Sequence, residues 1–487
     1  MSTSAVGEVY DVVVLGAGPV GQNVAARVRA GGLTVAVVER ELVGGECSYW
    51  GCVPSKALLR PVIAVADARS VDGAREAVSG TISAAGVFGR RDNYVTHWDD
   101  DGQARAVKEF GAELIRGHAR LDGPRRVVVT TSDGDSIELS ARHAVAVCTG
   151  STAALPDIPG IAEARPWTNR RATDSSQVPA RLAVVGAGGV GVEMATAWQG
   201  LGSSVTLLAR GAQLLPRMES FVGERVSRGL TEAGLTVRTG VSVKELRRPG
   251  PQAPVTVVLD DGSELEVDEV LFATGRTPNT GDIGMETVGL DPGAWLDVDD
   301  SCRVTGVEDN WLYALGDVNR RALLTHQGKY QARVVGAAIT ASAAGKPLDT
   351  TPWSAHVATA DSAAVPQVFF TEPEAASVGL TVRQAEQAGH RVVAVDVDMG
   401  ESVPGAYLYA DGYAGQARIV VDLDHDYLVG ATFVGPGISE LLHSATIAVA
   451  ARVPVDRLWH AVPCFPTISE VWLRLLEAYR DRASNAA

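Results

Sequence analysis

Short apolar runs rich in β-branched residues recur along the chain, and most of them end in glycine. The first run, 9–15, breaks into a glycine turn, which is followed by a stretch with helical spacing and by a second apolar run, 34–39. The same order of run, glycine turn, helical stretch and run returns from residue 181. Strands that alternate with helices in this way predict an α/β protein with parallel sheets.

The sequence pattern also predicts how the chain is divided into domains. A length of 487 residues exceeds what one core usually supports, so several domains are expected. Residues 57–120 are largely helical in pattern, and after about residue 345 a linker leads into an α+β region that is helical from Ile468 onward. A hairpin is expected over 417–435. Other strands are expected at 125–131, 143–150, 256–262, 268–275 and 311–319.

The first glycine turn has the spacing of a dinucleotide-binding fingerprint. Gly16, Gly18 and Gly21 follow the first strand at G-x-G-x-x-G spacing, and Glu39 ends the next strand. The glycines let the backbone approach a pyrophosphate at a helix N-terminus, and the acid accepts hydrogen bonds from ribose hydroxyls. The alternative is a glycine-rich turn in an unrelated α/β unit. Because strand, helix and acid are all in place, the motif predicts a Rossmann-type site.

A second fingerprint differs from the first at its acidic position. Its glycines have the same spacing, at Gly186, Gly188 and Gly191. The position that matches Glu39 holds Ala209, which is followed by Arg210 and, a turn or so later, by Arg217. Losing the acid and gaining guanidinium groups suits a 2′-phosphate, so this site is expected to take NADPH, with NADH as the alternative. The two arginines could instead be solvated surface charges.

Residues 44–56, GGECSYWGCVPSK, contain two cysteines, Cys47 and Cys52, at the start of a helical stretch. A short loop entering a helix can bring two Cα atoms within the roughly 4.4–6.8 Å that a disulfide needs, and a helix N-terminus favours thiolates. No Cys or His follows at ligand spacing, so no metal site is expected. The pair is therefore a candidate redox disulfide, the alternative being two cysteines that only pack.

Composition narrows the function classes. The 43 Lys and Arg against 58 Asp and Glu give a formal net charge of -15, which disfavours nucleic-acid binding. No long uncharged apolar run predicts a membrane span, and the N-terminus lacks the regions of a signal peptide, so a cytoplasmic location is expected. Five cysteines are too few for a structural disulfide framework, which favours a catalytic role for a close pair.

These motifs, in this order, resemble those of the class I pyridine nucleotide-disulfide oxidoreductases, the family of dihydrolipoamide dehydrogenase, glutathione reductase and mercuric reductase. The resemblance covers nearly the whole chain. It implies FAD on the first fingerprint, NAD(P)H on the second and a C-terminal α+β domain that makes a homodimer acting on a small molecule. The implied domains are an FAD-binding domain in two parts, 1–155 and 281–348, an NAD(P)-binding domain, 156–280, and a dimerisation domain, 349–487.

The resemblance also implies roles for single residues. Cys52 matches the thiol whose thiolate lies against the flavin, and Cys47 matches the interchange thiol that attacks substrate. Lys56 matches a lysine near flavin N5, and Glu193 matches its carboxylate partner. Electrons would pass from NAD(P)H through the flavin to a Cys47–Cys52 disulfide. Other positions at or near the cofactors are Thr149, Gly150, Gly275, Gly316 and Asp317.

The C-terminal segment HAVPCFPTISE departs from the family pattern. Aligned on Pro466, Thr467 and Glu470, the position of the family's acid–base histidine holds Phe465, so Glu470 lacks the histidine that it would orient. Since general acid–base catalysis is worth about 10²–10⁴-fold, this argues against a working lipoamide or glutathione disulfide reductase.

Two other residues could partly restore the lost proton chemistry, and a third is a candidate proton donor near the flavin. His460 lies five residues upstream of Phe465, and Cys464 is adjacent to it. His326 would lie near the flavin if the family's helix is kept. Each could equally be a packed or hydrogen-bonding residue without a catalytic role.

Three functions stay open. The first is an FAD-dependent, NAD(P)H-driven oxidoreductase with a non-standard acceptor, such as a quinone, a metal ion (Hg(II) or Cu(II)) or a specialised small molecule. The second is a disulfide reductase whose acid–base residue is displaced to His460 or Cys464. The third is a catalytically impaired flavoprotein with a binding role, against which the retained cysteines argue. Tyr49 and Trp50, together with Phe465, suggest an apolar or aromatic substrate cavity, although both could simply pack.

Overall fold

The structure, a computed structural model, describes residues 7–486, and side chains from 7 to 482. These residues form two compact units, each assembled from three stretches of the chain. Unit 1 comprises the described residues up to Pro54 together with Asp92–Ala154 and Gly275–Asp361. Unit 2 comprises Ser55–Arg91, Leu155–Thr274 and the described residues from Ser362 onward.

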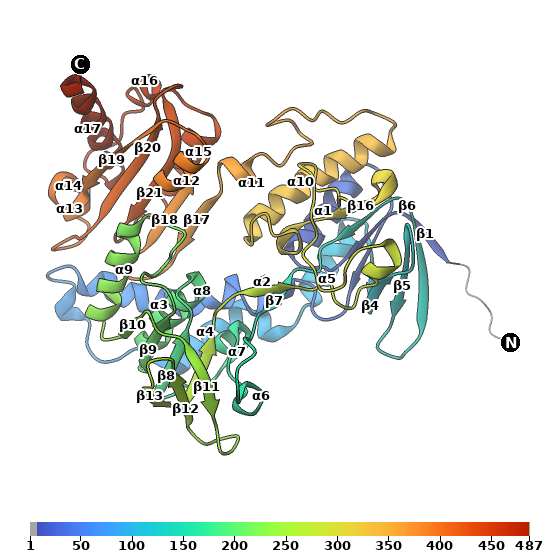
Figure 1. Ribbon diagram of the computed structural model, residues 1–487, viewed down its shortest axis with the longest axis horizontal. Coiled ribbons are helices and arrows are strands. Elements are labelled where there is room, and N and C mark those ends of the chain that lie inside the picture. Colours follow the sequence, from blue (N-terminus) through green and yellow to red (C-terminus); the bar gives the residue numbers. More distant parts are fainter. Residues whose placement is uncertain (1–6, 487) are drawn as a thin grey trace. The chain divides into compact units, whose positions relative to one another are not determined.

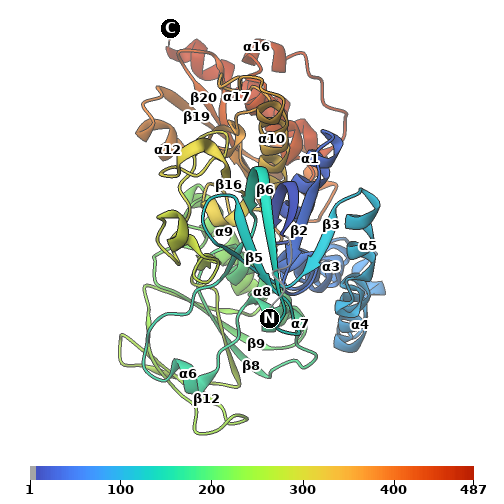
Figure 2. The ribbon, with the colours of Figure 1, turned by 90° about the vertical axis from the view of Figure 1, so that its right-hand side faces the viewer.

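Unit 1 is built on a seven-stranded sheet of order β3-β2-β1-β6-β5-β4, with β16 also paired to β6 (Figures 1 and 2). β1, β2, β3, β6 and β16 run parallel, and β5 pairs antiparallel with β6 on one side and with β4 on the other. The strands are β1 Glu8–Leu15, β2 Val35–Glu39, β3 Glu113–Arg116, β4 His118–Leu121, β5 Arg126–Thr130, β6 Ser136–Val147 and β16 Leu312–Ala314. The short pair β7 Ser151–Ala153 and β15 Arg276–Pro278 lies outside this sheet.

Alternating residues of β1 face the two sides of this sheet. Val12 and Val14 pack with helices α1 Pro19–Ala30 and α10 Thr325–Ala343, and Val13 and Leu15 pack with the segment that includes Met285. This period of two, with apolar residues on both faces, is what a buried parallel strand requires. Other helices that lie wholly in unit 1 are α2 Gly45–Tyr49, α5 Asp101–Glu109, η2 Thr96–Trp98, η3 Met285–Val288, η4 Glu308–Asn310 and η5 Gly316–Asn319.

Unit 2 contains a second parallel sheet of order β10-β9-β8-β14. Its strands are β8 Arg181–Val185, β9 Ser204–Ala209, β10 Thr236–Thr239 and β14 Glu269–Phe272, and the antiparallel strands β11 Val243–Arg247, β12 Val255–Leu259 and β13 Glu264–Val267 form a separate sheet. Helices of this part are α6 Ile161–Ala164, α7 Asn169–Asp174, α8 Gly189–Gly200 and α9 Ser220–Glu232. The helices α3 Cys52–Arg69, η1 Arg75–Ala77 and α4 Ala84–Tyr94 precede them in the sequence.

The C-terminal part of unit 2 is an antiparallel five-stranded sheet of order β17-β18-β21-β20-β19. Its strands are β17 Pro366–Phe369, β18 Ala375–Gly379, β19 Val392–Asp398, β20 Gln416–Asp422 and β21 Tyr427–Val434, so the expected hairpin is β20–β21. Its helices are α11 Ala360–Ala363, α12 Val382–Gln387, α13 Met399–Ser402, α14 Pro404–Tyr407, α15 Leu442–Ala450, α16 Val455–Leu458, η6 Ile468–Glu470 and α17 Val471–Ala486.

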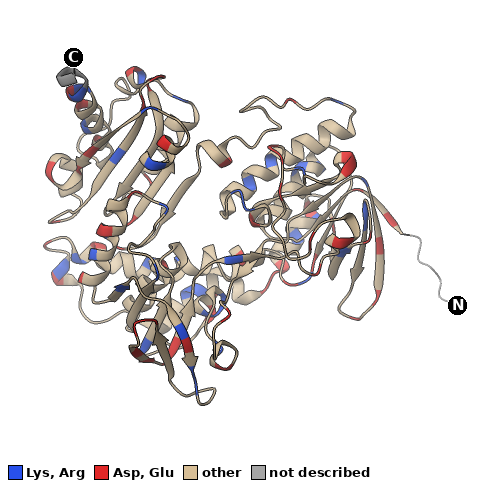
Figure 3. Cartoon of the chain, viewed as in Figure 1, with Lys and Arg blue, Asp and Glu red and all other residues tan. Residues whose placement is uncertain are grey.

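The predicted class, two Rossmann-like folds plus a C-terminal α+β domain, is confirmed by this architecture. The expectation of a largely helical stretch over 57–120 is wrong at its end, because β3 and the start of β4 lie there. β3 is an edge strand with exposed charged ends, so its sequence lacks the apolar run that marks the central strands. Figure 3 shows acidic and basic positions scattered over the described elements. Among the described residues no helix is long and apolar enough to cross a membrane.

Candidate active site

The two glycine turns share one backbone geometry. Gly16 and Gly186, directly after β1 and β8, have φ angles of +99° and +121°, which favour glycine. A Cβ on Gly21 would overlap the carbonyl oxygen of Gly16, and a Cβ on Gly191 would overlap that of Gly186. Each turn therefore requires glycine at its first and third positions for a steric reason.

The middle glycine of each turn is open to a ligand. Gly18 and Gly188 are the N-cap residues of α1 and α8, both with extended backbone. A Cβ on either would meet no atom within 4 Å. Free space beside a helix N-terminus is what a bound pyrophosphate needs.

The two folds differ where their second strand ends. The first glycine of each turn donates its N–H to Val38 or Leu208, so Glu39 and Ala209 occupy equivalent positions. Glu39 is 9% exposed. Its carboxylate oxygens accept hydrogen bonds from Ala17 N–H at 2.7 Å and, at 2.8 Å, from the backbone N–H two residues after Glu39 itself. Burial raises the pKa of Glu39, and the two backbone hydrogen bonds oppose that rise. Each oxygen keeps a lone pair that a ribose hydroxyl can use.

Arg210 and Arg217 stand near Ala209 in the second fold. Both side chains are exposed, and neither has an ion-pair partner among the side chains described from 7 to 482. The guanidinium groups of Arg210 and Arg217 follow a strand that ends in Ala209 and not in an acidic residue. Two cations in such a place suit a 2′-phosphate. Their role in cofactor choice stays a prediction.

A polar cluster surrounds the Gly316–Asp317 turn at the end of β16. The Asp317 carboxylate accepts a hydrogen bond from Ser151 Oγ at 2.6 Å, and Arg276 Nε donates to the same hydroxyl oxygen at 2.6 Å. The Arg276 guanidinium also lies 3.8 Å from the Glu46 carboxylate, beside the cysteine pair in the sequence. Arg276 therefore links the turn to the helix that carries Cys47.

Thr149 and Gly150 follow β6 in the same unit. The backbone oxygens of both accept hydrogen bonds from Asn279, at 2.9 and 3.0 Å. Thr149 Oγ1 is buried and has no hydrogen-bond partner within the described chain. Gly275, which precedes Arg276, receives a hydrogen bond on its oxygen from Ala154 N–H at 3.0 Å.

Cys47 and Cys52 are both thiols in this structure, and their side chains are in hydrogen-bond contact. The hydrogen bond with Cys52, followed by burial, raises the pKa of Cys47, so Cys47 holds its proton when its neighbour ionises. Cys52 is the first residue of α3, where the helix dipole favours an anion, and its Sγ lies 3.3 Å from Thr325 Oγ1. The geometry favours Cys52 as the thiolate of the pair.

Lys56 and Glu193 lie together in unit 2, 137 positions apart in sequence. Lys56 Nζ donates to Glu193 Oε2 at 2.7 Å, and the other carboxylate oxygen accepts from Phe370 N–H at 3.0 Å. The ammonium also lies 5.1 Å from the centre of the Phe370 ring. Glu193 is 6% exposed, so the ion pair and the backbone bond together compensate its burial.

The C-terminal segment has no histidine beside its buried carboxylate. Phe465 is 73% exposed, whereas Glu470 is 5% exposed. Arg474, one turn later, donates to Glu470 Oε1 at 2.6 Å, and Glu470 Oε2 is buried without a partner. An unsatisfied buried acceptor costs about 1–3 kcal/mol. His460 and Cys464 are both exposed.

Sequence reasoning missed several contacts of these residues. Thr325 and Phe370 are far from their partners in sequence, so no local signal identifies them. Arg474 could have been found, because an Arg four residues after Glu470 in a helical stretch predicts an ion pair. His326, the second residue of α10, has an exposed side chain.

The suggestion that Tyr49 lines a substrate cavity is wrong. Tyr49 is 1% exposed, and its hydroxyl donates towards the backbone oxygens of Val43 and Asp99, each at 3.3 Å. Gln103 donates to the same hydroxyl oxygen at 3.1 Å. The phenol is a structural cross-link inside unit 1.

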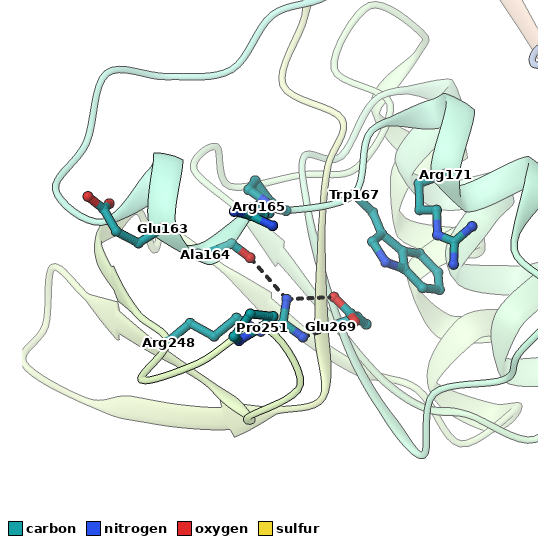
Figure 4. Close-up of a pocket in the computed structure, with 9 residues that line it drawn as sticks. Glu163, Ala164, Arg165, Trp167, Arg171, Arg248, Pro251 and Glu269 are labelled. Atoms are coloured by element: carbon teal, nitrogen blue, oxygen red, sulfur yellow. Dashed lines mark hydrogen bonds and ion pairs between the residues drawn. The ribbon is translucent and has the colours of Figure 1, made fainter.

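A cavity of about 330 Å³ in unit 2 does not coincide with any of these groups (Figure 4). Arg248 lies against it and donates all five N–H groups, to the backbone oxygens of Ala164, Ala253 and Asp268 and to both oxygens of Glu269. Its guanidinium is therefore saturated. The cavity is lined by Glu163, Ala164, Arg165, Pro166, Trp167, Arg171, Arg248, Pro251 and Glu269, none of which belongs to a glycine turn.

The residues present fit two dinucleotides. In unit 1 the open Gly18 cradle and the unpartnered Thr149 Oγ1 suit a phosphate and a polar flavin or ribityl group. In unit 2 the second cradle and the two exposed arginines suit a phosphorylated nicotinamide nucleotide. Over the described residues no group of three or more His, Cys, Asp or Glu side chains is arranged to hold a metal ion.

Comparison with protein families finds two matches. Residues 10–345 match the family described as pyridine nucleotide-disulphide oxidoreductase, and residues 365–476 match the dimerisation domain of the same family. Together these ranges include the cysteine pair, both fingerprints and the C-terminal segment.

Individual proteins of known sequence or structure are also similar to this chain over most of its length. A mercuric reductase from Staphylococcus aureus is 29% identical over 95% of this chain and 81% of its own, and dihydrolipoyl dehydrogenase 3 from Pseudomonas aeruginosa is 32% identical over 94% and 95%. The solved structure of the HOCl-induced flavoprotein disulfide reductase RclA from Escherichia coli matches with a TM-score of 0.80 and 22% identity, covering 96% of this chain and 99% of that one. The last match supports the fold.

Proposed function

The chain belongs to the pyridine nucleotide-disulphide oxidoreductase family, whose members are FAD-dependent enzymes that use NAD(P)H, and on this premise we propose that it delivers electrons to a small-molecule acceptor other than a disulfide. The observation that carries the proposal is the C-terminal segment. Phe465 is exposed at the place of the expected histidine, and Glu470 is paired with Arg474 instead. The matching dimerisation domain supports a homodimer.

The two cofactors are assigned to the two nucleotide folds. FAD would be held by the first glycine turn, Glu39, Thr149 and the Gly316–Asp317 turn, and NADPH by the second glycine turn with Arg210 and Arg217. When bound, FAD supplies the two-electron chemistry that links NADPH to the cysteine pair. NADH is the alternative donor.

The chain's own residues place charge and protons around this chemistry. Glu193 holds the Lys56 ammonium at 2.7 Å, so a positive charge is fixed at the start of unit 2. The Thr325 hydroxyl, 3.3 Å away, can donate a hydrogen bond to a Cys52 thiolate. Cys47 keeps its proton because its pKa is raised. These contacts support Cys52 as the electron-bearing thiolate and Cys47 as the outer thiol.

The acceptor is limited by what the C-terminal segment cannot do. Cleaving a disulfide substrate releases a thiolate that an acid must protonate, and Phe465 cannot supply a proton. A quinone or a metal ion such as Hg(II) or Cu(II) needs no proton at a departing thiolate. The similarity to mercuric reductases supports a metal ion, and the exposed Phe465 ring supports an apolar or aromatic molecule.

An acceptor panel tests the proposal. NADPH oxidation would be followed with a benzoquinone, Hg(II), lipoamide and glutathione disulfide for the native protein, Cys47→Ser, Cys52→Ser and the control Cys148→Ser, which changes a buried core thiol. We expect turnover with the quinone or the metal ion, little turnover with either disulfide, and an effect of the first two variants on the favoured acceptor. Ordinary turnover of lipoamide or glutathione disulfide would overturn the proposal.

A disulfide reductase with a displaced acid–base group is the second candidate, and the exposure of His460 and Cys464 favours it. In that case disulfide turnover would be measurable and would fall in His460→Ala or Cys464→Ser. If neither variant changed it, the displaced group would lie elsewhere and this candidate would fail.

A further inference from the structure

A chain of buried polar side chains lies behind the Gly316–Asp317 turn. Gln331, on α10, is fully buried, and its Oε1 accepts hydrogen bonds from Gly316 N–H at 2.7 Å and from Asn319 Nδ2 at 3.0 Å. Its Nε2 donates to Asp361 Oδ2 at 2.8 Å. One amide therefore joins the turn after β16 to a buried carboxylate.

Asp361 is the anchor of this chain of contacts. It is 7% exposed, and besides Gln331 it accepts hydrogen bonds from Gln327 Nε2 at 3.0 Å and Arg321 Nε at 3.2 Å. Arg321 supplies the countercharge that a buried carboxylate requires. Because Gln331 and Gln327 both donate to the Asp361 carboxylate, this carboxylate fixes the orientation of the two side-chain amides.

The turn is also held from its other side. The Asp317 carboxylate accepts from Ser151 Oγ at 2.6 Å, and Gly316 has a φ of +74°. A Cβ on Gly316 would stand 3.0 Å from a methyl group of Val20, which belongs to α1. The backbone here has little freedom, and Gln331 holds the turn through the Gly316 N–H.

We propose that Gln331 is a positioning residue for FAD, acting through the Gly316–Asp317 turn. This rests on the assignment of FAD to that turn in the proposed function. Gln331 also belongs to α10, whose first residue, Thr325, contacts Cys52, so the same side chain couples the turn to the helix that reaches the redox thiol. Gln327 offers a natural control, because it shares Asp361 but has no bond to the turn.

The experiment compares Gln331→Met with Gln327→Met. Both variants replace a buried amide by an apolar side chain of similar length, and both lose one hydrogen bond to Asp361. FAD is removed, and its dissociation constant is measured by fluorescence titration of the apoprotein, together with thermal unfolding with and without FAD. Loss of the two bonds to the turn is expected to raise the constant roughly 10–100-fold for Gln331→Met, against less than about threefold for Gln327→Met.

Gln331→Glu gives an independent readout that a structural role alone would not produce. Its carboxyl can still accept the bond from Gly316 N–H, but when ionised it faces the Asp361 carboxylate. We expect FAD affinity near that of the native protein at pH 5.5 and clearly weaker at pH 8.5. This variant keeps the test decisive if Gln331→Met does not fold.

Two results would overturn the inference. Equal shifts of the FAD dissociation constant in Gln331→Met and Gln327→Met would show a general loss of packing, and a pH-independent affinity in Gln331→Glu would exclude positioning through this amide. Failure of the proposed function is distinguishable, because it would show in the acceptor panel while these FAD affinities stayed as expected.

Discussion

The residues proposed to take up electrons and the residue proposed to deliver them differ in how far they match the family pattern. On the uptake side both glycine turns, the Lys56–Glu193 pair at 2.7 Å and the contacting thiols Cys47 and Cys52 are all in place. On the delivery side Phe465 is 73% exposed where a histidine is expected.

In the proposed function, uptake and delivery of electrons are separate tasks for separate residues. On the uptake side the backbone geometry restricts which residues are possible, because a side chain at Gly21 or Gly191 would overlap a backbone oxygen. The delivery residue stands in an exposed segment with no such restriction. The acceptor can therefore change while the cofactor chemistry stays the same.

Restoring the histidine is the largest expected change on the delivery side. Phe465→His is expected to raise lipoamide turnover by about 10²–10⁴-fold, because the imidazole supplies an acid and can donate to the unpartnered Glu470 Oε2. Steady-state kinetics with NADPH measures it. Val462→His, at another exposed apolar position of the segment, is the matched control. An unchanged rate in a folded Phe465→His protein would contradict the role of this position.

Converting the second nucleotide fold towards the first tests the uptake side. The double variant Ala209→Glu with Arg210→Ala restores the acid and removes a guanidinium, so it should shift preference from NADPH to NADH. Charge-assisted hydrogen bonds are worth about 1.5–3 kcal/mol, which predicts a change in the ratio of kcat/KM values of about 10–150-fold. Arg228→Ala, which removes an exposed arginine of α9, should leave the ratio unchanged. A native protein that already prefers NADH would refute the assignment.

A variant that changes the stability of the fold, but neither electron uptake nor electron delivery, would distinguish effects on the fold from effects on the reaction. Burial, with the carboxylates of Asp67 and Glu374 nearby, raises the pKa of Glu372 from 4.5 to about 7. Since the folded value lies above the unfolded one, its stabilising contribution is present below pH 4.5 and is lost as the pH rises through 7. Glu372→Gln cannot ionise.

We therefore expect Glu372→Gln to increase the free energy of unfolding at pH 8 by about 1–3 kcal/mol and to have no such effect at pH 4.5. Urea titration at the two pH values measures this. Glu401→Gln, an exposed glutamate of the same domain, is the control. A gain of equal size at both pH values would show that ionisation is not its cause.

The smallest expected effect concerns the ring beneath Lys56. Phe370→Leu keeps the backbone bond to Glu193 but removes the aromatic face 5.1 Å from the ammonium. Cation–π contacts of this kind are worth about 0.5–1 kcal/mol, so flavin reduction by NADPH should slow about two- to fivefold. Stopped-flow absorbance measures this rate. An unchanged rate would mean that Glu193 alone holds Lys56.

The parts of the site that are local in sequence could be predicted, and the parts made by distant contacts could not. The glycine turns follow from backbone geometry within six residues, so their spacing was sufficient. Lys56 and Glu193 were paired only through the family resemblance, because 137 positions separate them. Gln331 and Asp361 carry no motif and meet only through the packing of α10.

The fold shows the same limit. Central strands such as β1 and β8 can be predicted, because they have apolar residues on both faces. The edge strand β3 has exposed charged ends, so its sequence does not distinguish it from the helical stretch before it. Tyr49 beside the cysteines suggested a substrate cavity, yet its ring is buried in unit 1 because backbone oxygens are available to its hydroxyl.

Reoxidation of the reduced protein by different acceptors distinguishes a non-disulfide acceptor from a disulfide. The protein is reduced anaerobically with one equivalent of NADPH and then mixed in a stopped-flow instrument with a quinone, with Hg(II) or with lipoamide, while the long-wavelength absorbance of the thiolate against the flavin is followed. We expect this absorbance to form, to disappear rapidly with the quinone or the metal ion, and to persist with lipoamide. Rapid reoxidation by lipoamide would contradict this expectation.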